Sequence, residues 1–200
     1  TLKSFEMVGN DSNNPDEFAH PISANKYLLY QESLKELEAS IAARLSEYTK
    51  NILSLEYPHQ FTQSWTNRNS PGQTHHRHAH DNSIVSGVFY FDLPEGKDSI
   101  VFHKPRATNT YTMTPKMDQF GAAGNFYAYD WYQVTVKTFD LIFFPSFLEH
   151  SVPENLGTTD RWSLAFNSVP VYALGSFINL TELPIGQTTG YSDGDTEYEI

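Results

Sequence analysis

The chain has 200 residues, and none of them is cysteine. Without cysteine a protein can form no disulfide, offers no thiolate nucleophile, and cannot hold a sulfur-ligated zinc ion or an iron–sulfur cluster. Histidine and the carboxylates are therefore the side chains left to bind a metal ion.

Basic residues are also scarce, since 13 Lys and Arg stand against 24 Asp and Glu, for a formal net charge of −11. Binding to a nucleic-acid backbone needs a clustered excess of positive charge, so no nucleic-acid partner is expected. The sequence has no apolar run of about 18 residues and no signal-peptide pattern at its start. We therefore expect a soluble, cytoplasmic protein without a membrane partner.

What the chain does contain suits one globular domain. Apolar residues make up 39% and aromatic residues 14% of it, and no internal repeat occurs. This composition is enough to build a core and a pocket. We expect residues 1–200 to form a single domain, with an N-terminal loop and helical support over about 1–57, a β core over about 58–176 and a polar tail over about 177–200.

Helical periodicity marks residues 23–53, where apolar side chains recur every three or four positions without Pro or Gly. They are Leu28, Leu29, Leu34, Leu37, Ile41, Leu45 and Ile52. This spacing predicts one long helix, or two consecutive ones, covering a sheet. The same segment is a candidate surface for a homodimer.

After Pro58 the sequence is typical of β-strands, because short segments rich in aromatic and β-branched residues alternate with turn signals. The segments are 61–65, 83–92, 99–103, 127–137, 138–144 and 161–169. Six or more short strands behind a helical segment predict a mainly β protein of the α+β class, built as a barrel or sandwich.

Candidate metal ligands gather in the hexapeptide that runs from His75 to His80. In an extended segment alternate side chains share a face, so His78 and His80 can hold one ion between them, and His76 has the same parity. A third imidazole, His150, follows a buried strand and a turn at Pro145. The alternative is a solvated histidine run that binds divalent metals adventitiously.

The order of these residues resembles that of the 2-oxoglutarate- and Fe(II)-dependent oxygenases, in particular a microbial and phage branch with an H-x-H…H…R-x-S pattern. The matching positions are Trp65, Gly72, His78-x-His80, Ser86-Gly87-Val-Phe-Tyr90, Phe144-Pro145, His150-Ser-Val and Arg161-Trp-Ser-Leu-Ala-Phe-Asn167. The resemblance covers about residues 61–168. It implies a double-stranded β-helix, the cupin-like jelly-roll barrel, preceded by helices.

The resemblance also implies roles for single residues. His78 and His150 match iron ligands, and Arg161 matches the residue that grips the far carboxylate of 2-oxoglutarate. Arginine suits that task because its charged fork binds a carboxylate through two hydrogen bonds. Ser163 lies on the same strand face as Arg161, and Tyr90 matches a position where relatives place a hydroxyl toward the same carboxylate.

The third ligand departs from the common pattern, because most of the superfamily binds iron with two histidines and one carboxylate. Here the carboxylate position is His80. Asp81 is the alternative ligand, but it faces the opposite side of a regular strand unless a bulge turns it inward. We predict a three-histidine site made of His78, His80 and His150.

By this resemblance the chain is a dioxygenase that uses Fe(II), 2-oxoglutarate and O2. It would hydroxylate an unactivated carbon of a small-molecule or peptidyl substrate, such as a prolyl residue, and release succinate and CO2. Residues 107–125 are expected to form the lid that selects the substrate. If the chain is of viral origin, the cytoplasm would be that of the host.

Two other interpretations stay open. Gly72, His78, His80, Pro145 and His150 also resemble the two halves of the cupin motif, whose three-histidine dioxygenases do not use 2-oxoglutarate. The motif's glutamate, about four residues after the second histidine, is missing here, and Arg161 would have no role. The second alternative is a non-catalytic metal-binding jelly roll that acts as a structural or interaction protein.

Single residues have plainer alternatives too. Arg161 could pair with a surface carboxylate, as most arginines of β proteins do, and Tyr90 and Trp65 could simply belong to the core. Asn67 and Asn69 could line the pocket mouth, but their sequence does not separate this from turn chemistry.

Overall fold

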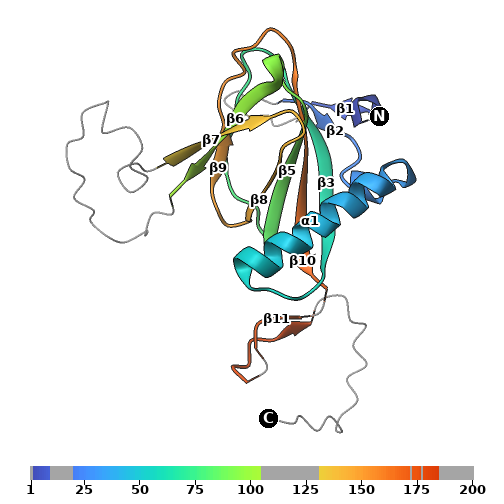
Figure 1. Cartoon of the computed structure of the whole chain (residues 1–200), viewed down its shortest axis with the longest axis vertical. Coiled ribbons are helices and arrows are strands. Elements are labelled where there is room, and N and C mark those ends of the chain that lie inside the picture. Colours follow the sequence, from blue (N-terminus) through green and yellow to red (C-terminus); the bar gives the residue numbers. More distant parts are fainter. Residues whose placement is uncertain (1, 10–19, 105–130, 172, 177, 185–200) are drawn as a thin grey trace, which may run out of the picture.

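The computed structural model describes residues 2–9, 20–104, 131–171, 173–176 and 178–184, and in it two antiparallel sheets face each other as a jelly roll (Figure 1). The six-stranded sheet contains, in spatial order, β1 (Met7–Val8), β2 (Ile22–Ser23), β3 (His59–Asn69), β10 (Arg161–Pro170), β5 (Val85–Asp92) and β8 (Leu141–Pro145). The four-stranded sheet contains β4 (His75–His78), β9 (His150–Val152), β6 (Lys97–His103) and β7 (Trp131–Lys137). The predicted fold class is confirmed.

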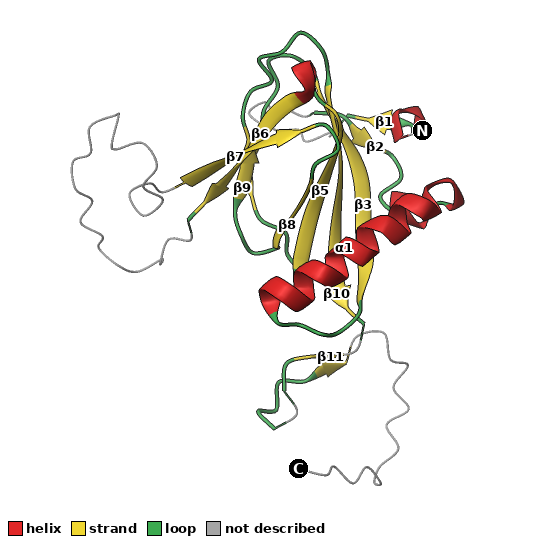
Figure 2. Ribbon diagram, in the orientation of Figure 1, coloured by secondary structure: helices red, strands yellow, loops and turns green. Residues whose placement is uncertain are grey.

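One helix, α1 (Lys35–Leu53), lies across the outer face of the six-stranded sheet (Figure 2). Its buried side chains Ile41, Leu45 and Thr49 are four residues apart and so form one stripe. Ile41 and Leu45 of this stripe pack with Leu164 and Phe166 of β10 in the main hydrophobic core. The helix ends at Ser54, which adopts a left-handed conformation with φ of 55°.

The predicted helix start at residue 23 is wrong. Residues 22–34 form β2 and two short 3-10 turns, Leu28–Tyr30 and Glu32–Leu34. The backbone here makes only short-range 3-10 bonds to itself, such as that from the Gln31 N–H to the Leu28 carbonyl at 2.9 Å, and it also bonds to β3. Ser64 Oγ accepts from the Leu29 N–H at 2.9 Å, and the Ser64 N–H donates to the Lys26 carbonyl at 2.7 Å. Leu28 and Leu29 are still buried. The apolar spacing of this segment therefore reflects packing in the core and not a continuous helix.

Strand β10 contributes side chains to two interiors. All ten residues of β10 are buried, because α1 covers one face of the sheet and the second sheet covers the other. Leu164 and Phe166 enter the core under α1, whereas Arg161, Ser163 and Ala165 face the space between the sheets. A second core, which includes Tyr90, Ile100 and Phe144, closes part of that space.

The predicted strands are present with shifted ends, and some strands were not predicted. The predicted strand 138–144 begins only at Leu141, since Phe139 has a φ of 76° and lies in the turn after β7. The segment of β4 was expected to be extended, whereas β1, β2 and β9 were not predicted, and neither was the hairpin of β11 (Ala173–Leu174) with β12 (Leu183–Pro184). The expected N-terminal loop around 10–15, the lid 107–125, residues 127–130 and the tail from 185 onward lie outside the described residues.

No helix within the described part of the chain is both long and apolar enough to cross a membrane.

Gly87 offers a test of the packing under α1. A Cβ at this position would lie 2.6 Å from Cε2 of the Phe166 ring and closer still to its Cζ. We expect Gly87→Ala to lower the free energy of unfolding by roughly 1–3 kcal/mol, because the ring must leave its place in the core. Urea denaturation measures this loss.

Phe166→Leu serves as the partner variant, since a smaller side chain leaves room for the added methyl group. The double variant should therefore lose less stability than the sum of the two single losses. Additive losses would show that the overlap with the ring is not the cause.

Candidate metal centre

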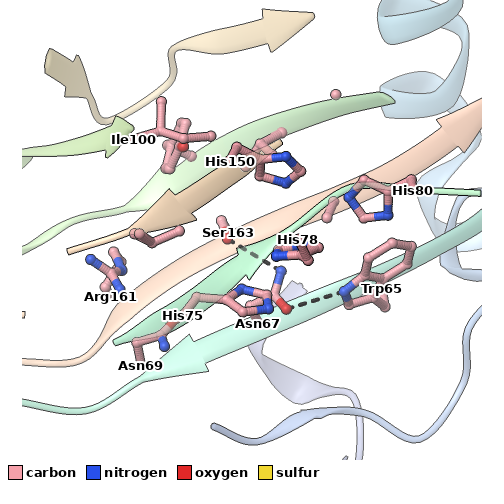
Figure 3. Close-up of a pocket in the computed structure, with 15 residues that line it drawn as sticks. Trp65, Asn67, Asn69, His75, His78, His80, Ile100, His150, Arg161 and Ser163 are labelled. Carbon is pink, nitrogen blue, oxygen red and sulfur yellow. Dashed lines mark hydrogen bonds between the residues drawn. The ribbon is translucent and has the colours of Figure 1, made fainter. Parts of the chain in front are cut away.

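A cavity of about 500 Å³, open mouth included, lies between the two sheets (Figure 3). β3 contributes Trp65, Asn67 and Asn69 to its wall, and β10 contributes Arg161 and Ser163. The strand register brings these side chains together, because Arg161 is opposite Asn69 and Ser163 is opposite Asn67. The four-stranded sheet supplies imidazoles on the other side.

Three imidazoles meet in this cavity. His78, His80 and His150 each offer a ring nitrogen, and these atoms all lie within 4.8 Å of one another. His78 and His150 are paired across β4 and β9. His80 follows β4 and is held by its backbone N–H, which donates to the Ser146 carbonyl at 2.9 Å.

Backbone carbonyls fix which nitrogen two of these rings can offer. Nδ1 of His78 lies 2.8 Å from the His76 carbonyl oxygen, and Nδ1 of His150 lies 3.0 Å from that of Leu148. A carbonyl only accepts, so both Nδ1 atoms carry the proton and Nε2 is left with its lone pair. This is the arrangement that metal-binding histidines commonly have.

Burial keeps the three rings neutral. It lowers the pKa of His150 to about 3 and that of His80 to about 4, with a further lowering from the neighbouring His78. The pKa of His78 is also lowered, again mainly by burial. Neutral imidazole is the form that binds a metal ion, so the cluster is ready to do so near pH 7.

Asp81, the alternative third ligand, is exposed. Two groups of side chains in the described part of the chain have a geometry that could hold a metal ion, and Asp81 is in neither. The set that the structure brings together is therefore the predicted one of three histidines.

Arg161 lies in the same cavity with its side chain only 2% exposed. Nη1 donates to Asp98 Oδ2 at 2.8 Å and to the Pro153 carbonyl at 3.2 Å. Nη2 is buried and has no hydrogen-bond partner among the described residues. Arg161 therefore does pair with a carboxylate, but the pair is buried and not at the surface. The Nη2 end of the guanidinium is left available to an anion.

Asp98 was missed by the sequence analysis. The predicted strand began at Ser99, whereas β6 begins at Lys97 and so includes Asp98. The side chain of Asp98 is 14% exposed, and it joins the four-stranded sheet to β10 of the other sheet. An isolated acid at a strand end gives no sequence signal for such a contact.

Polar groups surround the guanidinium. Ser163 is directly opposite Tyr90 on β5, and both line the cavity. Burial raises the pKa of the Tyr90 phenol, which therefore stays protonated and can donate a hydrogen bond. Asn67 accepts from Trp65 Nε1 at 3.1 Å and donates to Ser163 Oγ at 3.5 Å (Figure 3), so Asn67 and Asn69 line the cavity and do not form a turn.

A β-bulge in β4 changes which histidines of the run 75–80 face the cavity. His75 pairs with Val152 and His78 with His150, so two residues of β4 stand opposite the single residue Ser151. His75 and His78 consequently both line the cavity, although a regular strand would place them on opposite faces. The parity argument for His76 is wrong for this reason, and the His76 side chain is exposed.

A family model described as "Putative 2OG-Fe(II) oxygenase" matches residues 63–167. No curated protein sequence matches the chain. Among solved structures, the alpha-ketoglutarate-dependent epimerase SnoN from nogalamycin biosynthesis is 12% identical, with a TM-score of 0.57 over 86% of this chain and 70% of that one. HygX from Streptomyces hygroscopicus, solved with nickel and 2-oxoglutarate bound, is 14% identical, with a TM-score of 0.55 over 86% and 76%. These two likenesses show a shared fold.

The depressed histidine pKa values predict how the metal-free protein responds to pH. The folded state binds fewer protons than the unfolded chain between the ordinary pKa of 6.5 and the folded values of about 4 and 3. Stability should therefore be highest above pH 6.5 and fall as the pH is lowered toward 4. Urea denaturation in the presence of a chelator, from pH 7.5 to 4.5, measures this dependence.

The dependence should be shallower in His80→Asn, which removes one of the titrating rings. It should change less in His76→Asn, because the exposed His76 only adds to the lowering of the pKa of His75 and His78. An equal effect of the two variants would contradict the assignment to the buried histidines.

The pair of Arg161 and Asp98 gives a second prediction. Asp98→Ala would leave a buried guanidinium without its counter-charge, at a cost of about 3 kcal/mol in the free energy of unfolding. Asp160→Ala is the matched control, because Asp160 pairs with the half-exposed Arg68 at 4.0 Å. The pair of Arg68 and Asp160 should contribute less than about 1 kcal/mol to the free energy of unfolding. Similar losses of stability in both variants would show that burial does not make the pair of Arg161 and Asp98 the stronger one.

Proposed function

Because this chain belongs to the 2OG-Fe(II) oxygenase family, whose members use Fe(II), 2-oxoglutarate and O2, we propose that His78, His80 and His150 hold the iron and that Arg161 holds the cosubstrate. One observation carries the proposal. Three neutral imidazoles and a buried guanidinium with an unpartnered Nη2 line one cavity.

The side chains fit both groups. Nε2 of His78 and of His150 is free to bind a cation, and imidazole is a good ligand for iron. Nη2 of Arg161 lacks a partner among the described residues, and the carboxylate of a dicarboxylic acid would satisfy it. Arg161 and the three histidines lie toward different ends of the cavity, as a cosubstrate with two acid ends requires (Figure 3).

The protein's own part in the reaction is binding, orientation and exclusion of water. Arg161 fixes the far carboxylate of 2-oxoglutarate, and the Ser163 and Tyr90 hydroxyls donate hydrogen bonds to it. Asp98 holds Nη1 in place, so the guanidinium cannot turn away from the cavity. The apolar side chains of Val88, Ile100 and Val152 also line the cavity and help to exclude water from it.

Iron bound here would supply the oxidising chemistry, in which O2 and 2-oxoglutarate give succinate and CO2 while an unactivated carbon of the substrate is hydroxylated. We propose a small molecule or a single side chain of a peptide, such as a prolyl group, as the part that enters.

The cupin-type alternative explains less of the cavity. It accounts for three histidines but assigns no ligand to Arg161, whose buried Nη2 lacks a hydrogen-bond acceptor among the described residues although Nη1 is paired with Asp98. The non-catalytic alternative likewise leaves the alignment of Arg161 and Ser163 on one strand face without a purpose.

An anaerobic titration tests the proposal. Metal-free protein receives Fe(II) and then 2-oxoglutarate, and the visible charge-transfer band between the two is recorded. We expect the band in the wild type and in Arg68→Ala, whose arginine pairs with Asp160 at the surface, but not in Arg161→Ala.

A band that persists in Arg161→Ala would contradict the role of that residue. Iron binding without a band in the wild type would favour the cupin-type chemistry. If iron does not bind at all, the three histidines are not a metal site and the proposal fails.

A further inference from the structure

A second group of three imidazoles lies beside the first. His75, His76 and His78 also offer ring nitrogens that all lie within 4.8 Å of one another. Their ring centroids are 4.4 to 5.2 Å apart, with 5.2 Å between His75 and His76, 4.4 Å between His75 and His78, and 5.1 Å between His76 and His78. The set of His78, His80 and His150 is similar, with separations of 4.3 to 5.1 Å.

The second group depends on the bulge in β4. Without the extra residue opposite Ser151, His75 would lie on the far face from His78, and the two rings could not stack at 4.4 Å with an interplanar angle of 23°. A histidine run without fixed structure would not produce this geometry.

Buried neighbours hold His75 in place. The His20 ring packs on it with 4.2 Å between centroids, and Nε2 of His20 lies 3.2 Å from Asn67 Oδ1. His75 is thus a positioned ring at the inner side of the group, whereas His76 is exposed at the outer side.

His78 belongs to both groups but can serve only one ion at a time. Its Nδ1 donates to the His76 carbonyl, so Nε2 is its one free ligand atom. A lone pair that binds a cation in one group is not available to the other.

We propose that His75, His76 and His78 form a second, outer site for a divalent cation that prefers imidazole, such as Zn²⁺, and that this site competes with the inner set of His78, His80 and His150 for His78. Zn²⁺ generally binds nitrogen ligands more tightly than Fe²⁺ does. An ion in the outer site would withhold His78 from iron, so the outer site would make iron loading sensitive to competing metals.

Zn²⁺ binding stoichiometry tests the proposal on the purified, metal-free full chain. The wild type should bind one Zn²⁺ with high affinity, because the two sites exclude each other. His80→Ala should still bind one ion through the outer site, and His76→Ala should bind one through the inner site. The double variant with both substitutions should lose high-affinity binding.

Two further variants sharpen the test. Adding His75→Ala to His80→Ala should also abolish binding, because His75 is the positioned ring of the outer site. His59→Ala is the matched control, since His59 lies on β3 and belongs to neither group, and it should bind one ion as the wild type does. Circular dichroism of each variant confirms that it is folded.

The results separate this proposal from the oxygenase function. If His80→Ala binds no Zn²⁺, or if it keeps its ion after His75 or His76 is also replaced, the outer site does not exist. Two ions on the wild type would refute the sharing of His78. Failure of the oxygenase proposal would appear instead as a missing charge-transfer band in the titration with Fe(II) and 2-oxoglutarate.

Discussion

Successive side chains of β10 point to opposite faces of its sheet, and this alternation is the constraint on which the rest of the structure depends. The strand is buried on both faces, so each side chain must suit either the core under α1 or the cavity between the sheets. Leu164 and Phe166 serve the core, and Arg161, Ser163 and Ala165 serve the cavity. A register shift of one residue would place a guanidinium in the hydrophobic core, where an unpaired charge is very costly. The packing of α1 therefore also sets the direction of the side chains that line the cavity.

The buried charge of Arg161 is tolerated because the opposite sheet supplies a carboxylate. Asp98 accepts from Nη1 and leaves Nη2 facing a cavity with polar walls. Since Asp98 lies on β6 and Arg161 on β10, the contact also links the two sheets at the end of the cavity away from the histidine cluster. One ion pair thus joins the two sheets and leaves Nη2 without a hydrogen-bond partner among the described residues.

The sequence predicted those features that follow from regular alternation and from motif order. It predicted that His78, His80 and His150 converge and that Arg161 and Ser163 share a face, although their roles as ligands stay predictions. It did not predict that His75 lines the cavity, because the bulge that turns His75 inward depends on pairing with β9. It also did not predict the contact between Arg161 and Asp98, because that contact joins different sheets. The helix start was wrong for a similar reason, since bonds to Ser64 replace helical bonds around Leu29. Tertiary pairing decides all three.

Charge balance gives a reason why the proposed iron site would suit three histidines. Three neutral imidazoles add no charge, and Arg161 and Asp98 cancel each other, so the empty site is close to neutral overall. The two positive charges of Fe(II) would then be matched by the two carboxylates of 2-oxoglutarate. A carboxylate ligand in place of His80 would leave the loaded site with one excess negative charge. Because charge is costly to bury, a three-histidine iron site of the kind proposed would let metal and cosubstrate binding support each other, whereas a carboxylate ligand would favour the metal alone.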